Sequence, residues 1–180
     1  GHEGEGSLRS YLVSKGWANG VNTGISNDVS DLQMFDVNIE LTENGFNEHN
    51  QNNIIESIFA YITMLKRDGI PDYVYNEVKK LSEINFKFAE KSEPMSFVSN
   101  IVTDMQLYGP QSYITGSRFI EPNHSICMEY LNYLNVSNCK IRLISTNLKN
   151  KTNRKGRYYG TDYSTTLLIK KSHDWSHIDM

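Results

Sequence analysis

GHEGEGSLRSYLVSKGWANGVNTGISNDVSDLQMFDVNIEL, residues 1–41, is the stretch that decides the fold. Ser7 precedes a short apolar-periodic segment and is a preferred helix cap, and Gly16 is suited to end that helix. From Leu32 onward apolar and polar side chains alternate, which is typical of a strand with one buried and one wetter face. The apolar set of this strand is Phe35, Val37, Ile39 and Leu41. The stretch therefore predicts a glycine-rich loop, a short helix, a strand over 17–25 and a second strand paired with it.

The rest of the chain has mainly helical periodicity. Thr42 is predicted to cap a helix whose apolar residues recur from position 54 to 65. Pro71 and Pro94 precede two further helical stripes, the first with Val74, Val78, Leu81 and Phe88, the second with Phe97, Val98, Ile101, Val102 and Met105.

A last helix is predicted through Cys127 and Leu134, capped by Asn123 or Ser125. It is followed by a strand over 140–145 and a basic loop over 149–157. This order predicts an α+β fold, in which several helices cover one face of a mainly antiparallel sheet.

Composition excludes several classes of protein. The 180 residues carry a net charge of -3, which argues against a nucleic-acid binder that depends on phosphate neutralisation. No apolar run approaches the length of a membrane span, so we expect no membrane partner. Two cysteines make no disulfide framework and favour a reducing compartment such as the cytoplasm. We expect one domain over 1–157 and an extension or interdomain linker over 158–180.

The opening block also resembles a known family. GHEGxGSL, SKGW and the strand pair ending in LTE resemble the insulysin branch of the pitrilysin/insulinase zinc metallopeptidases, in the second of four homologous domains rather than the zinc-binding first. The resemblance continues through KRDG at 66–69, Phe86-Lys87-Phe88, Pro94 and the YGTDY segment at 159–163, so it covers most of the chain. It implies a partial domain that lacks its first strands, and hence an unpaired sheet edge through which copies of the chain could oligomerise.

The same resemblance implies a peptide-binding exosite distant from the zinc. It places five residues there: Gly1, Glu3, Val21, Thr23 and Ile25. A strand with a free edge can pair with an extended peptide, and Glu3 would neutralise the free ammonium of that peptide. The alternative is that the three strand residues are simply buried in the sheet and that Glu3 caps a helix or faces water. Where the family has Gly-Gly, this chain has Thr23-Gly24, a bulkier edge.

Chemistry-bearing clusters are scarce. The family binds zinc through His-x-x-Glu-His and a later Glu, and this spacing is absent from the sequence. We therefore expect no catalytic residue, no metal ligand and no cofactor in this chain, with zinc held by another domain of the parent enzyme. His173 and His177 are four apart but fit a solvated tail better than a metal site, and Cys127, three residues from His124, fits a small core residue.

Two functions follow. The first is a non-catalytic wall and substrate anchor within a metalloendopeptidase that encloses peptides in a chamber, with peptides and the neighbouring domains as partners. The second is a structural or interaction subunit of the same fold without peptidase activity. The basic residues Lys149, Lys151, Arg154, Lys155 and Arg157 fit a solvated loop better than an anion contact.

Overall fold

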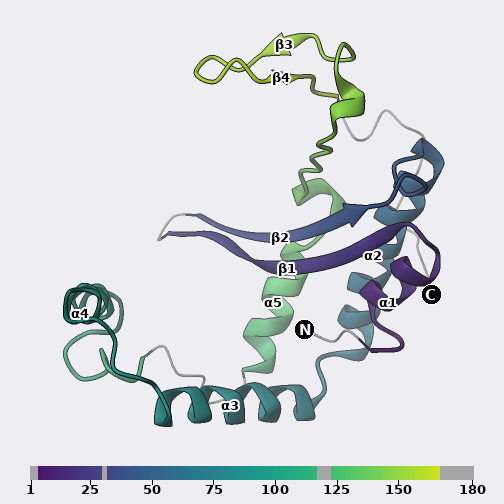
Figure 1. Ribbon diagram of the computed structural model, residues 1–180. Helices are drawn as coiled ribbons and strands as arrows, with labels where there is room; N and C mark the ends of the chain where they lie inside the picture. Colours follow the sequence, from purple (N-terminus) through teal and green to yellow (C-terminus); the bar gives the residue numbers. More distant parts are fainter. Residues whose placement is uncertain (1–3, 30–31, 117–122, 167–180) are drawn as a thin grey trace. The chain divides into compact units, whose positions relative to one another are not determined.

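The computed structural model describes residues 4–29, 32–116 and 123–166 (Figure 1). The chain divides into two compact units, residues 1–67 with 132–180, and residues 68–131. The described residues combine α-helices with antiparallel strand pairs, which confirms the predicted α+β class.

Helix α1, Leu8–Ser14, forms where the sequence predicts it. The Ser7 hydroxyl accepts a hydrogen bond from the Ser10 amide at 3.1 Å and so caps the first turn. Gly16 follows the helix with φ of 68°, a left-handed conformation that glycine adopts without a steric penalty. The Trp17 amide donates to the Leu12 carbonyl at 3.0 Å, so the chain turns tightly from α1 into the first strand.

Strands β1, Ala18–Val29, and β2, Leu32–Leu41, form a long antiparallel ribbon (Figure 1). The register pairs Val21 with Ile39, Thr23 with Val37 and Ile25 with Phe35. Because directly opposed residues share a face, the apolar side chains of both strands lie together on one side of the ribbon. This register confirms the alternation predicted for β2.

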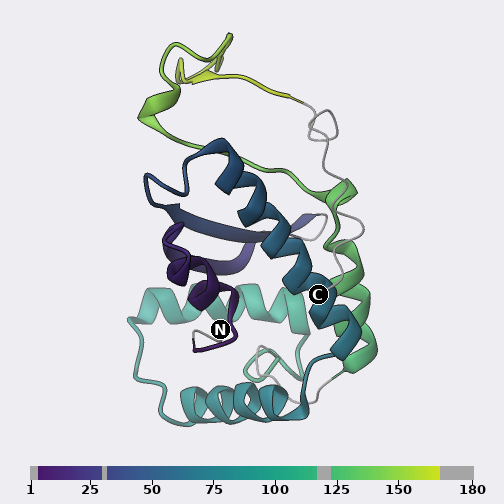
Figure 2. The ribbon, with the colours of Figure 1, turned by 90° about the vertical axis from the view of Figure 1, so that its right-hand side faces the viewer.

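The core of the first unit lies at the base of this ribbon. Leu12 is fully buried and clusters with Ala18 and Ile54. Partly buried apolar side chains from all four neighbouring elements pack against these three: Leu8, Trp17, Val21, Ile39, Leu41 and Ile58. Figure 2 shows α1 and α2 lying over the base of the ribbon, so one layer of helix covers one face of the strands.

Helix α2, Glu48–Asp68, begins later than the sequence predicts. The Thr42 hydroxyl accepts from the Gly45 amide at 3.0 Å and donates to the Gly16 carbonyl at 2.7 Å, so it stabilises a turn after β2 rather than the helix. The predicted cap at Thr42 is therefore wrong. The Asn47 side chain accepts a hydrogen bond from the His49 amide at 3.0 Å and caps the start of α2 instead.

The second unit contains α3, Asp72–Lys87, and α4, Pro94–Tyr108. Helix α3 begins directly after Pro71 and α4 begins at Pro94, but their apolar stripes are not buried: Leu81 is 53% exposed, Phe97 is 56% exposed, and α4 has no buried residue. The buried side chain of α3 is Tyr75.

Helix α5, His124–Tyr133, continues from the second unit into the first. The Asn123 side chain accepts a hydrogen bond from the Ile126 amide at 3.1 Å, so Asn123, rather than Ser125, caps α5.

The segment after α5 corrects one prediction. Residues 140–145 form no strand, because no described segment pairs with them; they run between the 3-10 turns η1, Val136–Asn138, and η2, Thr146–Leu148. A small hairpin follows, β3 at Arg154–Lys155 and β4 at Asp162–Tyr163, inside what was expected to be unstructured loop and linker. The predicted domain boundary at 157 falls in the turn of this hairpin and stays a prediction.

Candidate functional site

The candidate site is the outer edge of β1. This strand pairs with β2 along one edge, and no described residue pairs with its other edge. Three hydrogen bonds fix the two residues just before it: the Trp17 amide donates to the Leu12 carbonyl, the Thr42 amide to the Trp17 carbonyl at 3.1 Å, and the Thr42 hydroxyl to the Gly16 carbonyl. The strand therefore starts from a fixed base and presents its remaining backbone donors and acceptors along an open edge.

The three predicted strand residues of the exosite share one face but differ in exposure. Val21 is partly buried and packs against the Leu12 cluster. Thr23 is exposed, and Ile25 has 65% of its surface exposed. The structure thus brings Val21, Thr23 and Ile25 onto one strand face. Of the three, only Val21 is partly buried in the sheet.

The two glycines of β1 differ in their surroundings. A Cβ added at Gly24 would meet no heavy atom within 4 Å, so the strand surface is open there. A Cβ added at Gly20 would lie 3.5 Å from the Glu40 carboxylate, in ordinary contact. Neither glycine is required by packing within the described chain.

The opposite face of the ribbon is mainly polar. The Ser26 hydroxyl donates to the Asp36 carboxylate at 2.6 Å, which ties the outer part of β1 to β2. Asp36 and Glu40 both lie on this face. The ribbon is therefore amphipathic, with apolar side chains on the face that carries Ile25.

The structure does not test the predicted binding site for the peptide ammonium. Gly1 and Glu3 lie outside the described residues, as do His173 and His177. Among the residues that are described, no three His, Cys, Asp or Glu side chains gather closely enough to hold a metal ion. The described residues thus do not fit the family's zinc site, and whether this chain lacks catalytic zinc stays a prediction.

A polar cluster in the second unit was not predicted. The His124 Nε2 lies 3.3 Å from an Asp72 carboxylate oxygen, and its ring lies 4.6 Å from the Tyr75 ring centroid. The hydrogen bond with Cys127, followed by burial, raises the pKa of Tyr75 to about 12. Cys127 is half-buried, as its place on the apolar stripe indicated.

The members of this cluster contact one another across α3 and α5. It is best explained as a polar connection between two helices. No local pattern in the sequence predicts it, because Asp72 and Tyr75 lie more than 40 positions from their partners His124 and Cys127.

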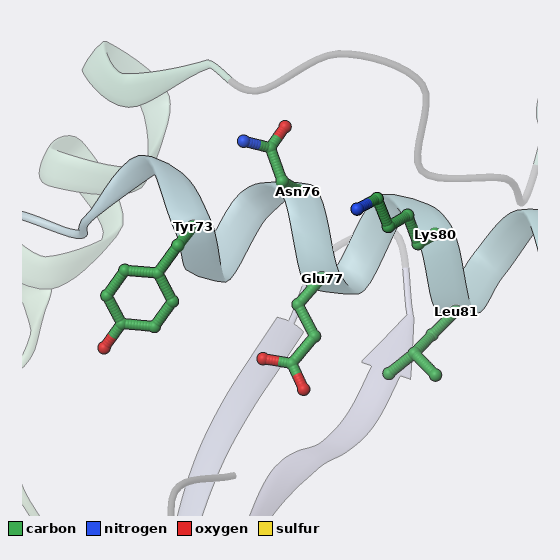
Figure 3. A pocket seen from close by; sticks show the side chains of 5 residues that line it. All are labelled: Tyr73, Asn76, Glu77, Lys80 and Leu81. Carbon is green, nitrogen blue, oxygen red and sulfur yellow. The ribbon is translucent and has the colours of Figure 1, made fainter.

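A shallow depression of about 420 Å³ lies against α3. Its lining is Tyr73, Asn76, Glu77, Lys80 and Leu81, all from the one helix (Figure 3). Figure 3 shows Asn76 and Lys80 on one side of the helix and Tyr73, Glu77 and Leu81 on the other, so their polar groups do not converge. The depression provides no constellation for chemistry.

No helix in the described part of the chain has both the length and the apolar character that crossing a membrane requires.

Two family models match the chain. Residues 1–82 match the inactive domain of peptidase M16, and residues 86–179 match the middle or third domain of peptidase M16. The two matches meet within α3.

Individual proteins are similar over nearly the whole chain. The peroxisomal insulin-degrading enzyme-like 1 of Arabidopsis thaliana is 33% identical over 96% of this chain, and the insulin-degrading enzyme of Homo sapiens is 31% identical over 100%. Nardilysin of Rattus norvegicus is 32% identical over 91%. The chain covers 18%, 18% and 14% of these relatives, so it corresponds to less than a fifth of each.

A solved structure shares the fold. The crystal structure of pitrilysin aligns with a TM-score of 0.65 at 19% identity, over 77% of this chain and 15% of that one. At this level of identity the likeness supports the fold of the described elements and no more.

Proposed function

Because the chain belongs to the peptidase M16 family, we propose that it is a non-catalytic, substrate-positioning part of an insulysin-like zinc metalloendopeptidase. The whole enzyme would enclose peptides in a chamber and cleave them at a zinc ion held by another domain. This chain would supply chamber wall and a peptide anchor. The observation that carries the proposal is the edge of β1, which no described residue pairs.

The binding mode would be addition of a peptide strand to this edge. Main-chain hydrogen bonds along β1 would give affinity with little sequence preference, and the open surface at Gly24 would admit the peptide backbone. Thr23 and Ile25 would contact alternate side chains of the peptide, while Val21 would hold the strand to its core. Gly1 and Glu3 would receive the peptide's amino terminus through a charge-assisted hydrogen bond.

Anchoring one end of a peptide raises the effective concentration of the remaining residues at a distant catalytic centre. The chain would therefore contribute to cleavage without touching the reacting bond. Zinc, cytoplasmic location and association of copies through the open edge belong to this proposal. The described residues support it through their fold and their open strand edge.

A second function is supported by the apolar side chains of the outer ribbon. The opposed residues Ile25 and Phe35 are 65% and 50% exposed on one face, a surface that suits permanent contact with protein. In this case the chain would be a structural subunit with no affinity for free peptides.

The deciding experiment measures how tightly the unaltered chain and the Glu3→Ala variant bind two peptides, one with a free and one with an acetylated amino terminus. The anchor proposal expects about ten-fold weaker binding of the free-amine peptide, which corresponds to about 1.4 kcal/mol, and no change for the acetylated peptide. Glu5→Ala is the matched control, an exposed carboxylate two residues away. Equal effects on both peptides refute the anchor, and absence of peptide binding in the unaltered chain favours the structural role.

A further inference from the structure

The β3–β4 hairpin carries a concentrated positive charge. Residues 149–163 contain five Lys or Arg side chains and a single acid, Asp162, for a net charge of +4. The whole chain has 18 basic and 21 acidic residues. The other 165 residues therefore contain 13 basic and 20 acidic residues and carry a net charge of -7. Charge is thus segregated onto one short element, which the overall value of -3 conceals.

The fold of the hairpin holds these cations in the solvent. The Gly156 amide donates to the Thr161 carbonyl at 2.8 Å, and the Gly160 amide donates back to Gly156 at 3.0 Å, with Gly160 at φ of 63°. These bonds close the turn that joins β3 to β4. The basic residues themselves are all exposed: Lys149, Lys151, Arg154, Lys155 and Arg157.

Two aromatic side chains lie at the tip among the cations. Tyr158 is 84% and Tyr159 is 94% exposed, values far above those of tyrosines that stabilise a core. The Arg157 guanidinium lies 5.6 Å from the Tyr158 ring centroid, so the ring and the charge are presented together. Exposed tyrosine beside arginine is the composition enriched in protein-binding surfaces.

One cation is already neutralised locally. The Lys155 ammonium lies 3.8 Å from the Asp162 carboxylate. The hairpin has no second acidic residue that could pair with its other four cations, which are Arg154, Arg157, Lys149 and Lys151. The local field therefore selects a partner with negative charge.

We propose that the hairpin over residues 149–163 is a docking surface for an acidic polypeptide segment, a run of Asp and Glu side chains in extended conformation. The cations are exposed and spread along the hairpin, which suits a chain of charges rather than a small anion. Exposed tyrosines beside these cations favour a protein partner over a nucleic acid or a membrane surface. The proposal is independent of the β1 edge.

The test measures binding of the full chain to an amino-acetylated, fluorescent peptide with six consecutive Glu residues, and to the same peptide with Gln. Acetylation removes the free ammonium on which the β1 anchor depends, so failure of one proposal leaves the other intact. We expect the Glu peptide to bind at least about five-fold tighter than the Gln peptide at low salt, with the difference lost at high salt.

The double variant Arg154→Gln, Arg157→Gln should bind the Glu peptide about five-fold more weakly, the effect of two exposed ion pairs of ordinary strength. The matched control is Lys91→Gln, Lys140→Gln, which removes two exposed cations elsewhere and should leave affinity within about two-fold. Arg157→Lys keeps the charge and should retain binding. Circular dichroism and the urea midpoint confirm that each variant is folded.

Three results would overturn the proposal. The first is equal binding of the Glu and Gln peptides, and the second is an equal loss in the control variant. The third is tighter binding, through Arg154 and Arg157, of a dT12 oligonucleotide or of vesicles containing phosphatidylserine, which would assign the hairpin to another class of partner.

Discussion

Replacing Leu12 with Ala tests whether the base of β1 is anchored as the structure indicates. Leu12 is fully buried and is the centre of the cluster with Ala18 and Ile54. Burial of a leucine side chain contributes about 1.5 to 3 kcal/mol, and the cavity left by truncation adds to the loss. We expect Leu12→Ala to lower the free energy of unfolding of the first unit by about 2 to 5 kcal/mol.

The assay is urea unfolding followed by the fluorescence of Trp17, which packs against the same cluster. The chain has two tryptophans, so the measurement is made with Trp175→Phe in both proteins. With a urea dependence of about 1 to 2 kcal/mol per molar for a unit of this size, the midpoint should fall by roughly 1 to 5 M.

The matched control is Leu107→Ala, the same chemical change at a leucine of α4 that is 68% exposed. Its expected cost is below about 1 kcal/mol, because little apolar surface returns to water. Equal midpoints for the two variants would show that Leu12 is not the core of the first unit, and the support proposed for β1 would fail with it.

Three further changes test other contacts. Gly45→Ala should destabilise by about 1 to 3 kcal/mol, because its Cβ would overlap the Trp17 carbonyl oxygen, whereas Gly24→Ala should stay within about 0.5 kcal/mol; urea midpoints compare them. The pKa of Tyr75 is raised from 10.0 to about 12 in the folded state, so the neutral side chain stabilises the fold fully below pH 10 and this stabilisation is lost as the pH rises towards 12. Between pH 9 and 11.5, the free energy of unfolding of Tyr75→Phe should therefore fall less than that of the unaltered chain. Parallel losses in the two proteins would contradict this. Ile25→Lys should weaken peptide binding without lowering the urea midpoint, since Ile25 is 65% exposed; unchanged titration of a free-amine peptide would count against the β1 edge.

The first unit was predictable because its signals are local. Ser7 and Gly16 delimit α1 through capping and a left-handed turn, and period-two alternation determines which face of β2 is apolar. Each signal acts over a few neighbouring residues, so no knowledge of the tertiary structure was required.

Predictions failed where distant partners decide the outcome. Thr42 has the composition of a helix cap, but its hydroxyl bonds the Gly16 carbonyl, 26 residues earlier, and stabilises a turn. Residues 140–145 have strand composition, but a strand requires a partner, and no described segment supplies one. The β3–β4 hairpin shows the converse, since its two-residue strands are too short to produce a periodic pattern.

The strand that carries the candidate site was predictable, and the burial along it was not. Val21, Thr23 and Ile25 do share one face of a strand that no described residue pairs on its outer edge, as the resemblance implied. Their unequal burial was not predictable, because it depends on where α1 and α2 end over the ribbon. The role of these residues in peptide binding stays a prediction.

The gradient of burial along β1 has a consequence for binding. At Val21 the strand is held by the core, so its backbone is already ordered before a peptide arrives, and association there would lose little conformational entropy. At Ile25 the apolar side chain is mostly in solvent and gains from being covered. A peptide that pairs along the whole edge would therefore meet a rigid template at one end and an apolar contact at the other. The Thr23-Gly24 pair lies between these two ends, and a change there would alter which peptides fit without disturbing the core that orients the strand.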